Sequence, residues 1–143
     1  MLLGVNHTFV LNTFDKVGNG VLPTPFSTNS NGFTDNGDSS FTYNGLASEL
    51  FEIDVVIQGF SHGTAGATVI NGAMFVNNII VPNSTISHRI SSTANDPVIY
   101  TYKHSLTLNP NDVVDFRVAN ISRSESGSFR QYSFIIKTIL NLL

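Results

Sequence analysis

Four histidines are the side chains whose chemistry could hold a metal ion. They are His7, His62, His88 and His104, and no two of them lie in one short motif with the spacing that metal ligands usually show. His88 and His104 alternate in phase with apolar residues, so they could meet between two layers of structure. Partly buried, hydrogen-bonded histidines explain that phase equally well. The sequence therefore predicts no metal site and no cofactor.

Carboxylates and serines offer the remaining routes to catalysis. Glu52 and Asp54 are two positions apart, which places both carboxylates on one face of a strand, as a hydrolase would need. Ser61-His62 and Ser87-His88 pair a hydroxyl with an imidazole, but a nucleophile and its base must also meet a third, orienting group. A solvated or interfacial acidic pair is the commoner explanation of Glu52 and Asp54. We therefore expect that the chain is not an enzyme.

Composition narrows the classes of partner. Of the 143 residues, 41% are hydrophobic and only 12% are charged, with a net charge of −3. This leaves no basic surface for nucleic acid. The absence of cysteine excludes a disulfide scaffold, a zinc ribbon and a thiol nucleophile. No apolar run approaches the ~20 residues that span a bilayer, and the first residues predict no signal peptide. We expect one domain, residues 1–143, with a surface made largely of Asn, Ser and Thr.

The stretch from Val98 to Val118 is the clearest structural signal. Aromatic and apolar residues occupy every second position from Val98 to Leu108, and polar residues lie between most of them, as in a half-buried strand. Asn109–Asp112 contains turn-forming residues, and Val113–Val118 reads as the return strand. The pattern predicts a long antiparallel hairpin that needs a second apolar sheet against it.

Other short strands complete the predicted layers. Leu50–Phe60 alternates in the same way, and no segment repeats apolar residues at helical intervals. We also expect short strands at Thr8–Leu11, Ser40–Tyr43, Thr85–Ile90 and Phe129–Ile139, and a proline-containing edge segment at Val21–Thr28. Apolar pieces at Ala67–Ile70 and Ala73–Val76 lie around Asn71-Gly72. The sequence further predicts a turn at Gly59–Gly66, a polar loop at Ser122–Gly127, and a loop at Asn29–Ser39 with Phe33 turned inward. About ten short strands predict an all-β antiparallel sandwich.

Three stretches resemble the trimeric jelly rolls of the tumour necrosis factor and complement globular-head superfamily. They are an aromatic strand with a Gly turn and a long core strand (Phe41–Gly45 with Phe51–Val55), a leucine-rich strand with a turn (His104–Val114), and a closing strand (Gly127–Phe129 with Ser133–Ile136). Two glycines of the family pattern are missing: Asn111 stands where Gly often precedes Asp112, and Phe134 is followed by Ile135-Ile136 where Phe-x-Gly is common. The resemblance implies a jelly-roll topology and a homotrimer.

A weakly charged outer sheet face could pack around a three-fold axis without stranding ions. The expected interface residues are uncharged side chains on the outer side of the central strands: Thr101, Ser105, Thr107, Gln131 and Ser133. Glu52, Asp54 and Lys103 fall on the same nominal faces, so they must be paired, lie at the rim, or count as evidence against this assignment. A merely solvated face is the alternative explanation.

The low charge and the Asn/Ser/Thr surface, taken with the resemblance, suggest a viral member. We expect a structural protein of the virion surface, either a capsid decoration or a fibre head, with capsid or fibre proteins as partners. The alternative is an extracellular knob that binds a receptor or glycan through its loops, with Tyr43 and His62 as candidate ligand residues.

Overall fold

The computed structural model describes residues 5–9, 11–16, 32–62, 68–90, 98–122, 125–129 and 131–139. These residues form strands and no helix. The strands are β1 (Val5–Phe9), β2 (Asp15–Lys16), β3 (Phe33–Asp35), β4 (Ser40–Tyr43), β5 (Glu49–His62), β6 (Thr68–Val76), β7 (Ile79–Ile80), β8 (Ile86–Ile90), β9 (Val98–Leu108), β10 (Val113–Asn120), β11 (Glu125–Phe129) and β12 (Gln131–Thr138). The predicted all-β antiparallel sandwich of the jelly-roll type is confirmed.

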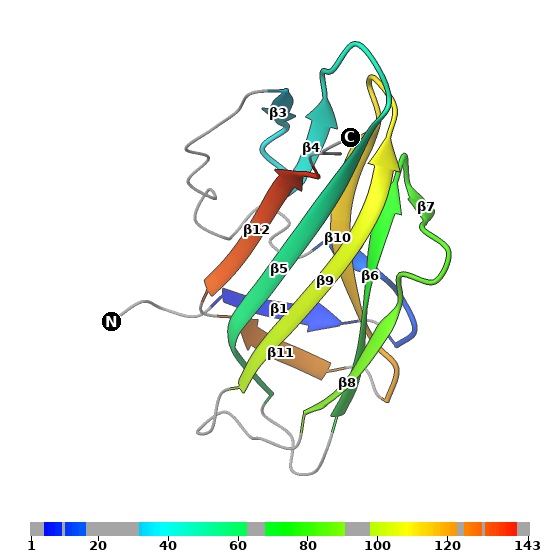
Figure 1. Cartoon of the computed structure of the whole chain (residues 1–143). Coiled ribbons are helices and arrows are strands. Elements are labelled where there is room, and N and C mark those ends of the chain that lie inside the picture. The colour runs from blue at the N-terminus through cyan, green and yellow to red at the C-terminus, as the bar shows by residue number, and fades with distance from the viewer. Residues whose placement is uncertain are drawn as a thin grey trace.

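Two sheets pack face to face (Figure 1). The β5 sheet has the order β1-β11-β5-β12, and β9 pairs with the second edge of β5 along most of its length. The β10 sheet has the order β3-β4-β10-β6-β7, with β2 on β10 and β8 on β6. All pairings are antiparallel. The long strands β12, β5 and β9 therefore form one continuous surface on the near side of Figure 1.

The inward side chains come from the alternation that the sequence displays. On β5, Phe51, Ile53, Val55 and Ile57 are buried. Tyr100, Tyr102, Leu106 and Leu108 of β9 and Val114, Phe116 and Val118 of β10 complete the same apolar cluster. These inward assignments were predicted correctly because one side of each strand must face the core.

The predicted hairpin between β9 and β10 is wrong. The two strands are joined by a turn at 109–112, but β9 pairs with β5 whereas β10 pairs with β4 and β6. The turn therefore carries the chain from one sheet to the other. The rings of Tyr102 and Phe116 meet across the core, 4.7 Å apart between centroids.

Several loop boundaries also differ from the prediction. The apolar pieces on either side of Asn71-Gly72 join in one strand, β6, which is paired on both edges, and Gly72 lets the Phe116 ring approach closely. β5 continues to His62, β11 begins at Glu125 within a predicted loop, and the first strand is Val5–Phe9. β3 lies within the predicted loop 29–39, where Phe33 packs against Tyr43 and Phe51 as expected. The predicted edge segment Val21–Thr28 lies outside the described residues.

Candidate functional site

The outer surface of strands β9, β5 and β12 is a flat face built from the alternate positions of three paired strands. We call it the β5 face. Rows of side chains cross it in register: Thr101, Val56 and Ser133 form one row, and the next holds Lys103, Asp54 and Ile135. A third row holds Ser105, Glu52 and Lys137. Neighbouring strands lie ~4.8 Å apart, so the side chains of each row are in reach of one another.

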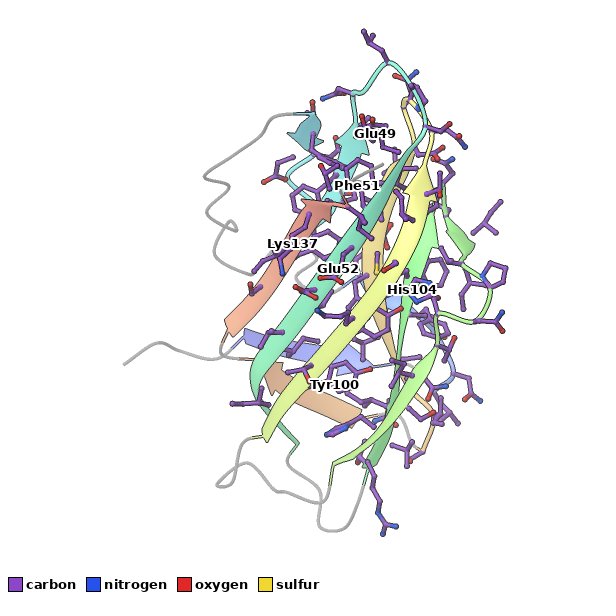
Figure 2. All side chains as sticks on the ribbon, viewed as in Figure 1. Glu49, Phe51, Glu52, Tyr100, His104 and Lys137 are labelled. Carbon is purple, nitrogen blue, oxygen red and sulfur yellow. The ribbon has the colours of Figure 1, made fainter. Side chains whose placement is uncertain are left out.

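Four charged side chains pair within these rows. Lys103 Nζ lies 3.1 Å from Glu52 Oε1 and 3.4 Å from Asp54 Oδ1. Lys137 donates a hydrogen bond to Asp54 Oδ2 and lies 3.8 Å from Glu52. Figure 2 shows Lys137 and Glu52 on the near face of β12 and β5. Two lysines and two carboxylates make the cluster formally neutral, so of the alternatives left open by the sequence these charges are paired.

The pairing shifts the proton affinities of the cluster. The hydrogen bond from Lys137, with Lys103 as a second partner, holds the pKa of Asp54 below its ordinary value of 3.8 against the opposing effect of partial burial. Hydrogen bonds to Glu52 and Asp54 raise the pKa of Lys103. Both shifts favour the charged forms of Asp54 and Lys103, so the pairing stabilises an ion pair rather than an acid and base couple.

Apolar and hydroxyl side chains surround the charges. Ile99 is 61% exposed and Ile135 is 46% exposed, although large aliphatic side chains are usually covered in the middle of a sheet. Thr101, Ser105 and Thr107 are exposed between them. The face thus presents a neutral ionic centre within uncharged surroundings.

The predicted interface residues all belong to these three strands. Thr101, Ser105 and Thr107 are exposed on β9, and Ser133 is half-buried on β12. Gln131 pairs through its backbone with Gln58 of β5, and its side chain lies outside the described set. Sequence reasoning missed the apolar members of the face, namely Leu50, Val56, Ile99 and Ile135. Their alternation with core residues was visible, but the register that groups them was not.

The two predicted ligand residues lie far apart. Tyr43 is 2% exposed on β4, and its hydroxyl donates a 3.0 Å hydrogen bond to the Ala47 carbonyl. It is therefore a core residue with its hydroxyl already satisfied, not a loop residue open to a ligand. His62 is the last residue of β5 and pairs through its backbone with Gly127. Tyr43 packs on Phe51, near the other end of that strand, ~35 Å away at ~3.3 Å per residue.

His88 and His104, the two histidines with described side chains, each pack against a tyrosine of β9. His88 packs edge-on against Tyr100, with 5.1 Å between ring centroids, and the His104 ring lies 6.2 Å from that of Tyr102. Among the described residues, no three His, Cys, Asp or Glu side chains are grouped to bind a metal. The described residues also contain no helix that is long and apolar enough to cross a membrane.

An open groove of about 450 Å³ lies between the β6–β7 hairpin and the turn after β9. Its walls are largely apolar, from residues such as Ile79, Ile80 and Leu106. Asp112 is the one ionisable residue in its lining, and its carboxylate already accepts hydrogen bonds from the Asn77 amide and the Asn109 backbone. The groove therefore lacks the converging ionisable groups that catalysis requires.

Comparison with known proteins places the fold. No protein-family model and no curated protein matches this sequence. Among solved structures, Eiger TNF from S. frugiperda superposes with a TM-score of 0.50 and 16% identity, covering 96% of this chain and 92% of that chain. Murine APRIL follows with a TM-score of 0.45 and 8% identity over 90% and 100% of the two chains. The CBM35 module from Cellvibrio japonicus Abf62 has a TM-score of 0.38 and 10% identity over 94% and 97%.

At such identities, the superposition on Eiger TNF shows a shared fold and nothing finer. The two weaker superpositions add no further argument. The protein is an antiparallel jelly-roll β-sandwich whose most distinctive surface is the β5 face.

Proposed function

We propose that the protein is a non-catalytic structural module that assembles into a homotrimer through the β5 face. The trimer would serve on a virion surface, as a capsid decoration or a fibre head. The observation that carries the assembly is the composition of that face: a self-neutralising charge cluster framed by exposed aliphatic and hydroxyl side chains.

When such a face is buried against another copy, no charged group is left without a partner of opposite charge. Each carboxylate of the cluster keeps a lysine partner from its own chain, so assembly does not depend on finding a counter-charge across the interface. Exposed Ile99 and Ile135 would gain from removal of water, by ~25 cal/mol per Å² of apolar area. Three copies rather than two are proposed because of the resemblance to trimeric jelly rolls.

The virion role is supported by composition and by the resemblance. A low charge content, the absence of cysteine and an Asn/Ser/Thr-rich surface suit a structural protein that is assembled in a reducing cytosol and later exposed outside. Neighbouring genes for capsid or tail proteins would support this part of the proposal. Neighbours that encode a secretion system would contradict it and favour an extracellular module.

Light scattering on the purified chain at micromolar concentration tests the assembly. We expect a mass three times that of one chain, because an obligate interface buries about 2,000 Å² or more. Thr101→Arg and Ser133→Arg each place a charge on the face and should give folded monomers. Leu46→Arg is the matched control, since Leu46 is fully exposed on the loop after β4.

A monomeric wild-type chain would overturn the trimer. So would a trimer that both arginine variants leave intact. A monomer that binds immobilised glycans, with binding lost in His62→Ala, would favour the knob instead.

A further inference from the structure

Asn-Gly pairs are positions where a protein chain can react with itself. Glycine has no Cβ to shield its amide nitrogen, and it permits backbone conformations closed to other residues. Five such pairs begin at Asn19, Asn31, Asn36, Asn44 and Asn71. Both residues are described for the last three, and the structure holds these three pairs very differently.

The pair at Asn71 is locked in a sheet. Asn71 and Gly72 lie within β6, which is paired with β10 on one edge and β8 on the other. The Ser87 hydroxyl donates a 2.6 Å hydrogen bond to Asn71 Oδ1. A Cβ on Gly72 would lie 2.4 Å from the Phe116 ring, so the core requires glycine here as well. An extended strand held on both edges cannot fold the Gly72 nitrogen onto the Asn71 side chain.

The pair at Asn36 is exposed but fully hydrogen-bonded. The Gly37 nitrogen donates a 2.8 Å bond to Asp35 Oδ1. The Asn36 amide donates to the Ser40 hydroxyl at 3.0 Å, and its oxygen accepts from the Thr42 hydroxyl at 3.1 Å. Loss of the Gly37 proton is further disfavoured by the adjacent carboxylate, because two negative charges would face each other.

The pair at Asn44 lacks these restraints. The Asn44 side chain is exposed, and its amide donates one hydrogen bond, to the Thr34 hydroxyl at 2.7 Å. Within the described part of the chain, neither the Asn44 side-chain oxygen nor the Gly45 nitrogen has a hydrogen-bond partner. Gly45 begins an open loop whose tip, Leu46, is fully exposed.

Packing also requires glycine at position 45. The loop passes directly over the Tyr43 hydroxyl, and a Cβ on Gly45 would lie 1.9 Å from that oxygen. Tyr43 is itself fixed by its hydrogen bond to Ala47 and by ring contacts with Phe33 and Phe51. Gly45, whose lack of a side chain makes Asn44 reactive, is therefore required by the packing on Tyr43.

From these contacts we propose that Asn44 is a site of spontaneous covalent modification, in which its amide is lost through a cyclic imide. Hydroxide removes the Gly45 amide proton, and the nitrogen forms a bond to Asn44 Cγ. The bond from Cγ to Nδ2 breaks, and Nδ2 leaves as ammonia after taking up a proton from water. Water then opens the ring at either carbonyl, which leaves an aspartyl or an isoaspartyl residue at position 44.

The modification would change the end of the sandwich that carries β3, β4 and the loop 44–48. Each event makes the chain one unit more negative than its formal −3 and removes the donor that binds Thr34. The isoaspartyl product also inserts a backbone carbon next to Gly45, where the fit over Tyr43 is tight. This site is separate from the β5 face, so it does not depend on the proposed assembly.

Peptide mapping by tandem mass spectrometry tests the proposal on the folded chain over days at mildly alkaline pH. We expect Asn44 to convert about tenfold faster than Asn36, the factor that one retained hydrogen bond on the attacking nitrogen contributes. Asn71 should not convert measurably. In urea the three rates should become similar, because sequence alone then decides them. Asn44→Gln should abolish the reaction at that position and serves as the matched amide control.

Asp35→Ala is a second test of the proposal, because it removes the hydrogen-bond acceptor of the Gly37 nitrogen and leaves the loop after Asn44 unchanged. Its Asn36 rate should rise toward that of Asn44. Conversion of Asn36 or Asn71 ahead of Asn44 in the folded wild-type chain would overturn the proposal. Equal rates at Asn44 and Asn36 in folded wild type would do the same.

Discussion

The two outer faces of the sandwich use charge in opposite ways. On the β10 sheet, Asp115 is 1% exposed and is paired with Arg117, whose Nη2 lies 3.0 Å from Asp115 Oδ2. The Arg117 guanidinium lies 4.2 Å above the Phe75 ring and also donates to Asn78. On the β5 face, four charges pair near the surface, and both lysines are more than half exposed.

The difference follows from what covers each face. The segment 11–16 runs beside β10, where β2 pairs with Arg117 and Val118. From this segment, Phe14 packs on Phe75 and Lys16 reaches Asp38 at 2.6 Å. Side chains of this segment thus pack on the β10 sheet, whereas the β5 face is the surface proposed above for assembly.

Arg117→Ala should give the largest effect on either face. It leaves the Asp115 carboxylate buried without its partner, which typically costs about 3–5 kcal/mol in the free energy of unfolding. Urea denaturation would measure the loss. A cost under about 1 kcal/mol would mean that the pair is no more buried in solution than the cluster on the β5 face.

Acid should act on the β5 face through Asp54. A carboxyl whose pKa is lowered by folding adds stability above its ordinary value of 3.8, and that stability is lost as pH falls through the lower folded pKa. Asp54→Asn should therefore flatten the dependence of melting temperature on pH in this acidic range. Unchanged pH dependence would show that the lysines do not stabilise the carboxylate.

Loss of single lysines should cost little. Lys103→Ala and Lys137→Ala remove exposed ends of a network in which each carboxylate keeps another lysine, so each should cost under about 1 kcal/mol in a dissociated chain. The effect should shrink further in high salt. A loss of stability as large as that in Arg117→Ala would contradict the difference proposed between the β5 face and the β10 sheet.

Thr101→Ala should be the smallest change. In the monomeric Ser133→Arg background it should cost well under 1 kcal/mol, because its hydroxyl is exposed. In the assembled wild-type background the cost should rise if Thr101 is interfacial. Thermal melts of both pairs measure the difference, and equal costs would place Thr101 outside the interface.

Local alternation predicted which side of each long strand faces the core, and it grouped the polar residues of β9 correctly. It could not tell which sheet a strand joins, so β9 and β10 were taken as partners. The burial of Asp115 was also invisible, because its neighbours across the sheet, Ser40 and Phe75, lie 40 or more positions earlier in the chain. Tyr43, at the end of a correctly predicted strand, was taken as a candidate ligand residue, although its ring is buried and its hydroxyl bonds the following loop at Ala47.

The central position of β5 sets the order in which the molecule can be built. Phe51 pairs with Leu106 on one edge and with Thr138 on the other, so both partners are synthesised long after β5 itself. Closing such distant pairs makes folding slow, in the range of milliseconds to seconds for β topologies. Until β12 has left the ribosome, β5 has an open edge and an apolar side, which exposes the nascent chain to aggregation.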